Sequence, residues 1–358
     1  IHFEPFYDEV FIRYRIDGDL EKESCISKNT YKTVCSRIKV MAGLDITEKR
    51  LPQDGKIYFM YDEKSFDLRV STLPTVYGEK VVIRILYKFD SHDIVSILDQ
   101  KIKNEYTLRE LLNEKSGMVL VTGPTGSGKS TTLYTMINEI NTESRNIVTI
   151  EDPVEYTLKG VNQVNINEKT GLNFAAGLKA MLRQDPDVMM VGEIRDSETA
   201  LVAVRAGITG HLVLSTLHTK DAVSAITRLK DIGIPYYLIA STLRVVIAQR
   251  LVKKICTKCR YKYAPSEIEK RLTGIDDKAF LYKGKGCRFC KGTGYSGRTA
   301  IYEILYIDDE SRKIIEDGKD FERLKGKILC SITQMSKKLL KEGIININEY
   351  MKAGFAVQ

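Results

Sequence analysis

The sequence contains no long apolar run and no N-terminal leader. No stretch of about 18 consecutive apolar residues occurs in the 358 residues, so no transmembrane helix is predicted. A basic segment followed by an apolar one, which marks an export signal, is also missing. The chain begins with Ile1 rather than Met, so we expect it to be part of a longer protein. Any membrane attachment should then come from partners or from the part that precedes Ile1.

The sequence also lacks internal repeats, low-complexity tracts and dense blocks of one charge. Its net charge is +8, but basic and acidic residues are interleaved along the chain. Interleaved charges are typical of a solvated surface, whereas nucleic-acid binding favours clustered cations or a helix-turn-helix, and neither is evident. With 43% hydrophobic and 28% charged residues, the composition is that of a globular protein. A nucleic-acid partner is therefore not expected.

Residues 1–88 read as a small α/β domain. Apolar alternation predicts strands at residues 10–17, 57–61, 66–73 and 80–86, and helical spacing predicts a helix at residues 31–44. Residues 89–104 are polar and poorly periodic, so we place a linker there.

Residues 105–358 have a different pattern and form the predicted second domain. A helix at residues 108–114 precedes four short apolar runs, at residues 118–122, 146–150, 187–192 and 211–217. Helical stretches at residues 131–140, 174–183 and 197–206 separate most of these runs. Such alternation indicates a parallel sheet covered on both faces, with ligands bound beyond the strand ends. Residues 251–300 form a cysteine-containing insert, and residues 301–358 are predicted to be mostly helical.

A phosphate-binding loop follows the first apolar run. Residues 123–130 fit G-x-x-x-x-G-K-[ST] at every fixed position, between a predicted strand and a predicted helix. Glycines let backbone N–H groups surround phosphate oxygens, and the helix N-terminus adds a favourable dipole. Lys129 can reach the β and γ phosphates, and the Ser130 hydroxyl can bind Mg²⁺. The predicted ATP-binding residues are Gly123, Pro124, Thr125, Gly126, Ser127, Gly128, Lys129, Ser130 and Thr131.

Acidic and histidine residues follow the other apolar runs. Glu151 and Asp152 end the second run, and Glu193 follows the third, after a glycine where a Walker B aspartate is usual. His211 and His218 flank the fourth run. Carboxylates beside phosphates can hold Mg²⁺ or orient an attacking water. A histidine at a strand end is more often structural, but the pair around one strand of this sheet favours a functional His218.

Together these segments resemble the four signature motifs of the type II/type IV secretion ATPase superfamily. The N-terminal segments 1–5, 13–18, 51–55 and 67–71 resemble that family as well, so the resemblance covers nearly the whole chain. It implies a PAS-like N-terminal domain and a RecA-like ATPase domain that works as a ring hexamer with ATP and Mg²⁺.

The resemblance also implies roles for individual residues. Glu193 would be the catalytic glutamate, Glu151 and Asp152 would assist Mg²⁺ and water, and His218 would sense the γ-phosphate. Arg69 and Arg84 match the positions from which the N-terminal domain supplies arginines to the nucleotide, although both could instead be solvated strand residues. Lys56 stands where relatives often have arginine, which leaves a third basic contact open.

The insert contains two C-x-x-C pairs. Two such pairs can complete a tetrahedral zinc site, whereas a redox dithiol would need only one pair. Secretion and pilus-extension ATPases resemble this chain in carrying such an insert, whereas retraction ATPases generally do not. The remaining Cys25, Cys35 and Cys330 are scattered, as reduced cysteines of a cytosolic protein would be. The four predicted zinc ligands are Cys256, Cys259, Cys287 and Cys290.

The leading hypothesis is a hexameric motor that couples ATP hydrolysis to type IV pilus assembly or type II secretion. By the resemblance, its partner is an inner-membrane platform protein, which would hold it at the cytoplasmic face of the membrane. The alternative is a DNA translocase or a nucleic-acid-binding P-loop protein, and stimulation of hydrolysis by DNA would favour it.

Overall fold

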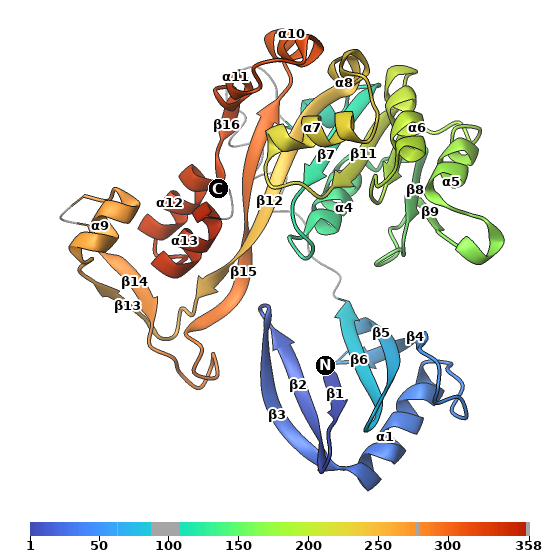
Figure 1. The fold of residues 1–358 in the computed structure, drawn as a ribbon, viewed down its shortest axis with the longest axis vertical. Helices are drawn as coiled ribbons and strands as arrows, with labels where there is room; N and C mark the ends of the chain where they lie inside the picture. The colour runs from blue at the N-terminus through green and yellow to red at the C-terminus, as the bar shows by residue number, and fades with distance from the viewer. Residues whose placement is uncertain (63, 87–107, 277–278, 356–358) are drawn as a thin grey trace. The chain divides into compact units, whose positions relative to one another are not determined.

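The computed structural model describes residues 1–62, 64–86, 108–276 and 279–355 (Figure 1). The chain divides into two compact units, residues 1–90 and 91–358. The predicted linker at residues 89–104 lies outside the described residues. Within the described ranges, no helix is both long enough and apolar enough to cross a membrane.

The first unit is an antiparallel sheet with one helix against it. The strand order is β3-β2-β1-β6-β5-β4. Two strands were not predicted: β1 has only four residues, and β3 is an edge strand made mostly of charged and polar residues. The elements are β1 (His2–Pro5), β2 (Glu9–Ile16), β3 (Asp19–Ser27), α1 (Lys28–Met41), β4 (Gln53–Tyr61), β5 (Lys64–Thr75) and β6 (Gly78–Leu86).

Helix α1 covers one face of this sheet. It begins after Ser27, whose side chain accepts a hydrogen bond from the backbone N–H of Thr30, an N-cap of the usual kind. Tyr31, Cys35 and Ile38 recur at helical spacing and are buried in the core of the unit. The predicted helix at residues 31–44 is thus present, beginning three residues earlier.

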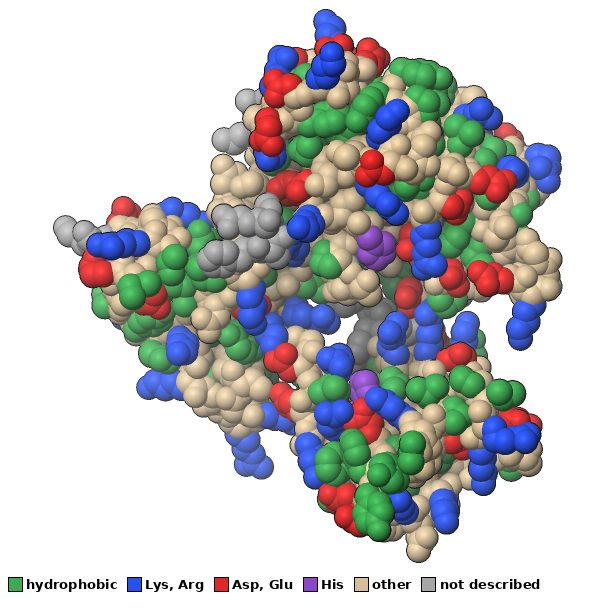
Figure 2. Space-filling model, viewed as in Figure 1, with side chains coloured by type: hydrophobic (Ala, Val, Ile, Leu, Met, Phe, Trp, Pro, Cys, Tyr) green, Lys and Arg blue, Asp and Glu red, His purple; other side chains and the backbone are tan. Residues whose placement is uncertain are grey.

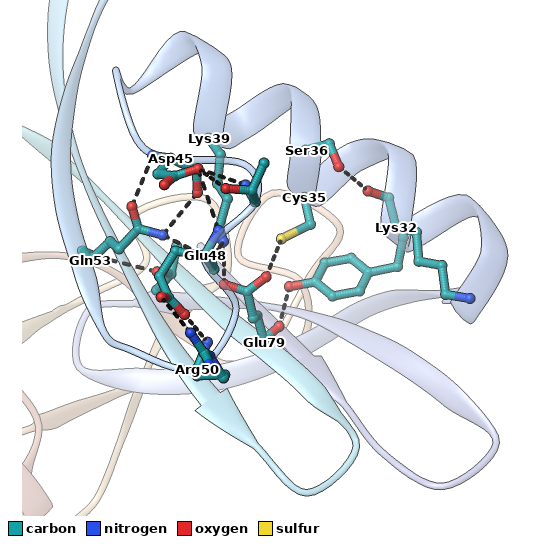
Figure 3. Close-up of polar contacts among 12 residues, drawn as sticks. Lys32, Cys35, Ser36, Lys39, Asp45, Glu48, Arg50, Gln53 and Glu79 are labelled. Carbon is teal, nitrogen blue, oxygen red and sulfur yellow. Dashed lines mark hydrogen bonds and ion pairs between the residues drawn. The ribbon is translucent and has the colours of Figure 1, made fainter.

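A buried ion pair fastens α1 to the strands (Figure 3). The Lys39 side chain is 1% exposed and pairs with Glu79, which is 10% exposed at the start of β6. The Lys39 ammonium also donates to the backbone oxygen of Glu48 at 2.7 Å. Tyr31 Oη donates to the backbone oxygen of Glu79 at 2.6 Å, and Gln53 Nε2 donates to the backbone oxygen of Glu48 at 3.1 Å. One polar network therefore joins α1, the loop before β4, and β6.

Three cationic residues lie in one row across β4, β5 and β6. Arg69 is directly opposite Lys56 on one side and Arg84 on the other. Directly opposite residues in a sheet share a face, so the three side chains project from the same face. Ile57 and Val70, one residue along each strand, are buried in the core, so this row lies on the face away from α1.

The second unit contains an eight-stranded sheet in the order β16-β15-β12-β7-β11-β10-β8-β9. The strands from β12 to β9 are parallel, while β15 and β16 are antiparallel additions. A separate hairpin pairs β13 with β14. The strands are β7 (Gly117–Thr122), β8 (Ile147–Glu151), β9 (Asn162–Asn165), β10 (Val188–Val191), β11 (Leu212–Leu217), β12 (Leu243–Ile255), β13 (Arg260–Tyr263), β14 (Leu281–Gly284), β15 (Tyr295–Tyr306) and β16 (Ile328–Cys330).

Helices cover both faces of this sheet. Val119 and Val121 of β7 pack in a core with α3, α4, α12 and α13, whereas Met118 and Leu120 pack in a second core with α5 to α8. This alternation explains why the buried strands read as continuous apolar runs. The helices are α3 (Leu108–Leu112), α4 (Lys129–Ile140), α5 (Phe174–Met181), α6 (Ser197–Ile208), α7 (Ala222–Asp231), α8 (Tyr236–Thr242), α9 (Glu267–Thr273), α10 (Asp309–Asp317), α11 (Glu322–Lys325), α12 (Ile332–Lys341) and α13 (Ile347–Phe355), with a 3₁₀ turn at Glu168–Thr170.

The α/β class predicted from the sequence is confirmed. All four apolar runs are strands in the parallel part of the eight-stranded sheet, namely β7, β8, β10 and β11. Strands β12 and β15 were not predicted, and residues 301–358 contain β16 and the end of β15 besides their helices.

Candidate functional site

The phosphate-binding loop lies between β7 and α4, as the sequence predicts. Gly128 caps α4 with φ of 89°, a left-handed conformation that favours glycine. Gly123 leaves no room for a side chain, because a Cβ there would lie 2.3 Å from the backbone oxygen of Gln249. Ser130 is exposed and Thr131 half-buried in the first turn of α4, while Pro124, Thr125 and Gly126 are exposed. The loop is therefore open to solvent on one side and closely packed on the other.

Lys129 points into this loop. Its ammonium donates to the backbone oxygens of Gly123 at 2.8 Å and Pro124 at 3.1 Å. Burial lowers the pKa of Lys129, and the nearby Glu193 carboxylate works in the opposite direction. The ammonium is thus held inside the loop, at the place where a P-loop binds phosphate oxygens.

Gln249 supports the loop from β12, and the sequence analysis missed it. Its Nε2 donates to the backbone oxygen of Ser127 at 2.7 Å, and its Oε1 accepts from Thr132 Oγ1 at 2.6 Å. Only 2% of the residue is exposed. The available signal was an uncharged polar residue inside the apolar run at residues 243–252.

Glu193 and His218 meet beside Lys129. His218 Nε2 lies 3.3 Å from Glu193 Oε2, and Arg195 pairs with the other oxygen of Glu193. Burial lowers the pKa of the His218 imidazole, and the charge of Lys129 lowers it further. The Glu193 carboxylate works in the opposite direction, but its effect is smaller. His218 is therefore mostly neutral at pH 7, when its Nε2 can donate or accept a hydrogen bond according to its tautomer.

Two threonines tie the ends of β7 and β11 together. Thr122 Oγ1 and Thr219 Oγ1 are 2.6 Å apart, and the backbone N–H of Thr219 donates to Thr122 Oγ1 at 2.9 Å. The segment that carries His218 is therefore fixed to the residue that precedes the phosphate loop. His211 lies at the opposite end of β11, where its Nδ1 is 3.1 Å from the backbone oxygen of Ala206, a structural arrangement.

Glu151 has a different environment from Glu193. It is 4% exposed, and its oxygens accept hydrogen bonds from Tyr134, Thr149 and Gln163. Burial raises the pKa of Glu151. Asp152, the next residue, is exposed, and its charge contributes to raising the pKa of Arg195 after the larger effect of Glu193.

Arg69 and Arg84 belong to the first unit, and each unit is described by itself. Arg69 is half-buried and Arg84 is exposed. Their assigned role toward the nucleotide stays a prediction.

The four cysteines of the insert come together into one cluster. Their sulfur atoms lie within 4.8 Å of one another, with Sγ–Sγ distances of 3.9 Å for Cys256–Cys287, 3.8 Å for Cys259–Cys290 and 3.7 Å for Cys287–Cys290. A tetrahedral zinc ion with Zn–S bonds of about 2.3 Å requires sulfurs about 3.8 Å apart. The donor set and its spacing therefore fit zinc.

Backbone N–H groups favour a thiolate in this cluster. Burial works to raise the pKa of Cys290, but the N–H groups of Cys287 and Gly294, at 3.2 and 3.3 Å from its sulfur, help to bring it down to about 6. Thiolates are the form in which cysteines bind metals. The surrounding segments 253–263 and 281–298 carry Lys and Arg but no Asp or Glu, and blue side chains occupy this part of the insert in Figure 2.

Comparison with known proteins gives a consistent result. A family model described as "Type II/IV secretion system protein" matches residues 1–352. The type II secretion system protein E of Dickeya dadantii is 48% identical over 319 residues, and the type II secretion system ATPase E of Vibrio cholerae is 44% identical over 357 residues. The type IV pilus assembly ATPase PilB of Thermus thermophilus is 47% identical over 331 residues. These alignments cover 89%, 98% and 91% of this chain.

The chain is shorter than these relatives. It spans 64% of the Dickeya protein, 71% of the Vibrio protein and 37% of the Thermus protein. Among solved structures, the pilus retraction motor PilT with bound ADP matches with a TM-score of 0.64 and 29% identity, over 98% of this chain and 92% of PilT.

Proposed function

This chain belongs to the type II/IV secretion system protein family, and we propose that it hydrolyses ATP to drive type IV pilus assembly or type II protein secretion. The observation that carries the proposal is the meeting of Lys129, Glu193 and His218 beside the phosphate loop. Glu193 and His218 follow β10 and β11, and Lys129 begins α4 after the loop that leaves β7; these three strands are neighbours in the sheet.

Each of these residues has a task in the proposed reaction. Lys129 and the backbone N–H groups of residues 123–130 would hold the phosphates, and the Ser130 hydroxyl would hold Mg²⁺, which neutralises charge on the phosphate oxygens. Glu193 would orient the attacking water and accept its proton. His218, hydrogen-bonded to Glu193, would contact the terminal phosphate. Because burial and the charge of Lys129 lower the pKa of His218, this side chain would be mostly neutral and would repel the Lys129 ammonium little.

The cationic row on the first unit supports the proposed roles of Arg69 and Arg84. Three cations side by side on one face of a sheet can bind an anionic ligand. We assign these two arginines to the phosphates of ATP and leave a third basic contact, from Lys56, open. A guanidinium fork neutralises the charge of a transferring phosphoryl group better than an ammonium can.

Further parts of the proposal concern metal and partners. Zinc held by the four cysteines would join the two C-x-x-C turns and stabilise the insert. We also propose a homo-hexamer that acts on an inner-membrane platform protein at the cytoplasmic face of the membrane. The net charge of +8 and the phosphate loop are compatible with the DNA translocase alternative but do not favour it over the motor.

Two substitutions test the proposed site. Lys129→Ala should abolish ATP hydrolysis in a chain that still folds, because the phosphates lose their cation. Glu193→Gln should bind ATP normally but hydrolyse it about 10²–10⁴-fold more slowly, because the amide keeps the shape and loses the base. Glu198→Gln on α6 is the matched control, since Glu198 is 61% exposed and pairs only with Lys179 in the described structure. Normal turnover in either site variant would refute the assignment.

The arginines need a separate experiment. Arg69→Ala or Arg84→Ala should reduce turnover by about 10³–10⁵-fold, with a much smaller loss of ATP affinity, if the charge stabilises the transition state. Lysine replacements should restore little. Full activity in the double alanine variant would remove both residues from the proposal.

A further inference from the structure

We infer that Glu151 is a positioning residue that fastens helix α4 to the segment after β8, and that it is not a ligand of Mg²⁺ or of the attacking water. The inference rests on the proposed function, because it concerns how that site is held in place. It differs from the role that the sequence resemblance implies for Glu151.

The Glu151 carboxylate already has hydrogen-bond donors on both oxygens. Tyr134 Oη donates to Oε2, while Thr149 Oγ1 at 2.6 Å and Gln163 Nε2 at 3.2 Å donate to Oε1. These donors come from α4, β8 and β9. A buried carboxylate with three donors is satisfied where it lies, and moving it toward a metal would leave those donors unpaired.

Tyr134 connects this carboxylate to the next segment. Its side chain is buried on α4, and its hydroxyl also accepts a hydrogen bond from the backbone N–H of Glu155 at 3.1 Å. The Tyr134 ring contacts Tyr156 edge to face, with ring centroids 4.6 Å apart. Burial, followed by the charge of Glu151, raises the pKa of Tyr134 far above its usual range, so the phenol remains a donor.

The order of the strands places Glu151 away from the phosphate loop. β8 is the third strand from β7, with β11 and β10 between them. Strands lie about 4.8 Å apart, so the ends of β7 and β8 are separated by about 14 Å. Glu193 and His218 follow the two intervening strands. Glu193 is thus the acidic group beside Lys129, and Glu151 lies farther along the sheet, at the end of β8.

The consequence for the site is geometric. Helix α4 starts in the phosphate loop, and Tyr134 lies five residues after Lys129 on that helix. Fixing Tyr134 to Glu151 and to Glu155 therefore sets the spacing between the loop and the segment that carries Asp152. The negative charge of Asp152 in turn helps to raise the pKa of Arg195, which pairs with Glu193. The network holds the acidic side of the site at a defined distance from the phosphate side.

The test compares Tyr134→Phe, Glu151→Gln and the double variant in the full chain, with ATP turnover measured against Mg²⁺ and against ATP. Each single variant should lower kcat by about 10- to 100-fold, the loss expected for a hydrogen bond to a charged group. The Mg²⁺ concentration for half-maximal activity should not change. The double variant should be no slower than the slower single variant, because both remove one interaction.

Tyr156→Phe is the matched control, since it keeps the ring that packs on Tyr134 and should leave turnover unchanged. A raised Mg²⁺ requirement in Glu151→Gln alone, or losses that multiply in the double variant, would overturn the inference. If Glu151→Gln fails to fold, Thr149→Val removes one donor to the same carboxylate and should show the same unchanged Mg²⁺ requirement, with a smaller loss of kcat.

Hydrogen exchange separates this inference from the proposed function. Tyr134→Phe and Glu151→Gln should speed amide exchange in α4 and in residues 152–156 to the same degree, without ATP present. That result would support the network even in a chain without ATPase activity, and unchanged exchange in both variants would refute it even in an active chain.

Discussion

Replacing Lys39 with methionine should destabilise the first unit strongly, although Lys39 has no proposed contact with nucleotide. Methionine keeps most of the volume of the lysine stem but removes the charge. Glu79, only 10% exposed, would then keep a buried carboxylate without its cation, and the backbone oxygen of Glu48 would lose a donor. Removing one partner of a buried ion pair costs about 3–5 kcal/mol.

Amide hydrogen exchange of the α1 peptides measures this cost in the full chain. Each 1.36 kcal/mol is a factor of ten, so exchange through unfolding of the unit should accelerate by about 150- to 5,000-fold. Arg50→Met is the matched control in the same network. Its side chain is 90% exposed and lies 3.6 Å from Glu48, so the expected change is within about threefold.

The double variant Lys39→Met, Glu79→Met decides whether charge is the cause. Replacing both members of a buried pair with apolar residues is often neutral, so exchange should return most of the way to that of the unaltered chain. If Lys39→Met exchanges no faster than Arg50→Met, the pair does not stabilise the unit. If the double variant is as unstable as the single one, packing rather than charge accounts for the loss.

Three further predictions concern acid, metal and the loop support. Burial works to raise the pKa of Glu4, but hydrogen bonds from Arg13 and Lys80 lower it to about 2 from an ordinary 4.5. The resulting stabilisation of the folded state, about 3 kcal/mol at most, is complete above pH 4.5 and is lost as the pH falls toward 2. Glu4→Gln should remove this pH dependence from acid-unfolding curves. Elemental analysis should find one zinc per chain, and its removal by chelator should increase proteolysis within residues 251–300 while ATP binding is retained; absence of zinc would contradict the assignment. Gln249→Ala should weaken ATP binding about tenfold in calorimetric titration, because the loop loses two hydrogen bonds that hold it; unchanged affinity would show that the loop needs no support from β12.

The sequence predicted the features that depend on residues close together in the chain. The phosphate loop is of this kind, since its glycines, its lysine and its flanking strand and helix form one continuous segment. Gln249 could not be found in this way, because its partner Ser127 lies 122 positions away and an isolated glutamine has no motif.

The two acidic segments illustrate the same limit. Glu151 and Glu193 each follow an apolar run, so their place in the sequence pattern does not distinguish their environments, and only the family resemblance gave them different roles. Their difference comes from the position of β8 and β10 in the sheet and from Tyr134 on another element, which only the folded chain brings together. The predicted strands also omitted β12 and β15; β12 is buried on both faces along most of its length and shows no alternation.

Strand β12 has a mechanical consequence. Gln249 in its middle holds the phosphate loop, and Cys256 follows its last residue, seven positions on. At about 3.3 Å per residue the two points are about 23 Å apart along one strand. Over this length the strand is paired with β15, whereas its pairing with β7 ends at Ala248, and Figure 1 shows β12 and β15 running together toward the hairpin β13–β14. The two paired strands therefore connect the phosphate loop directly with the cysteine cluster. Their register shift between Lys253 and Ile255 is the place where this connection can bend, so a movement of the loop would change the position of the cysteine cluster through that point.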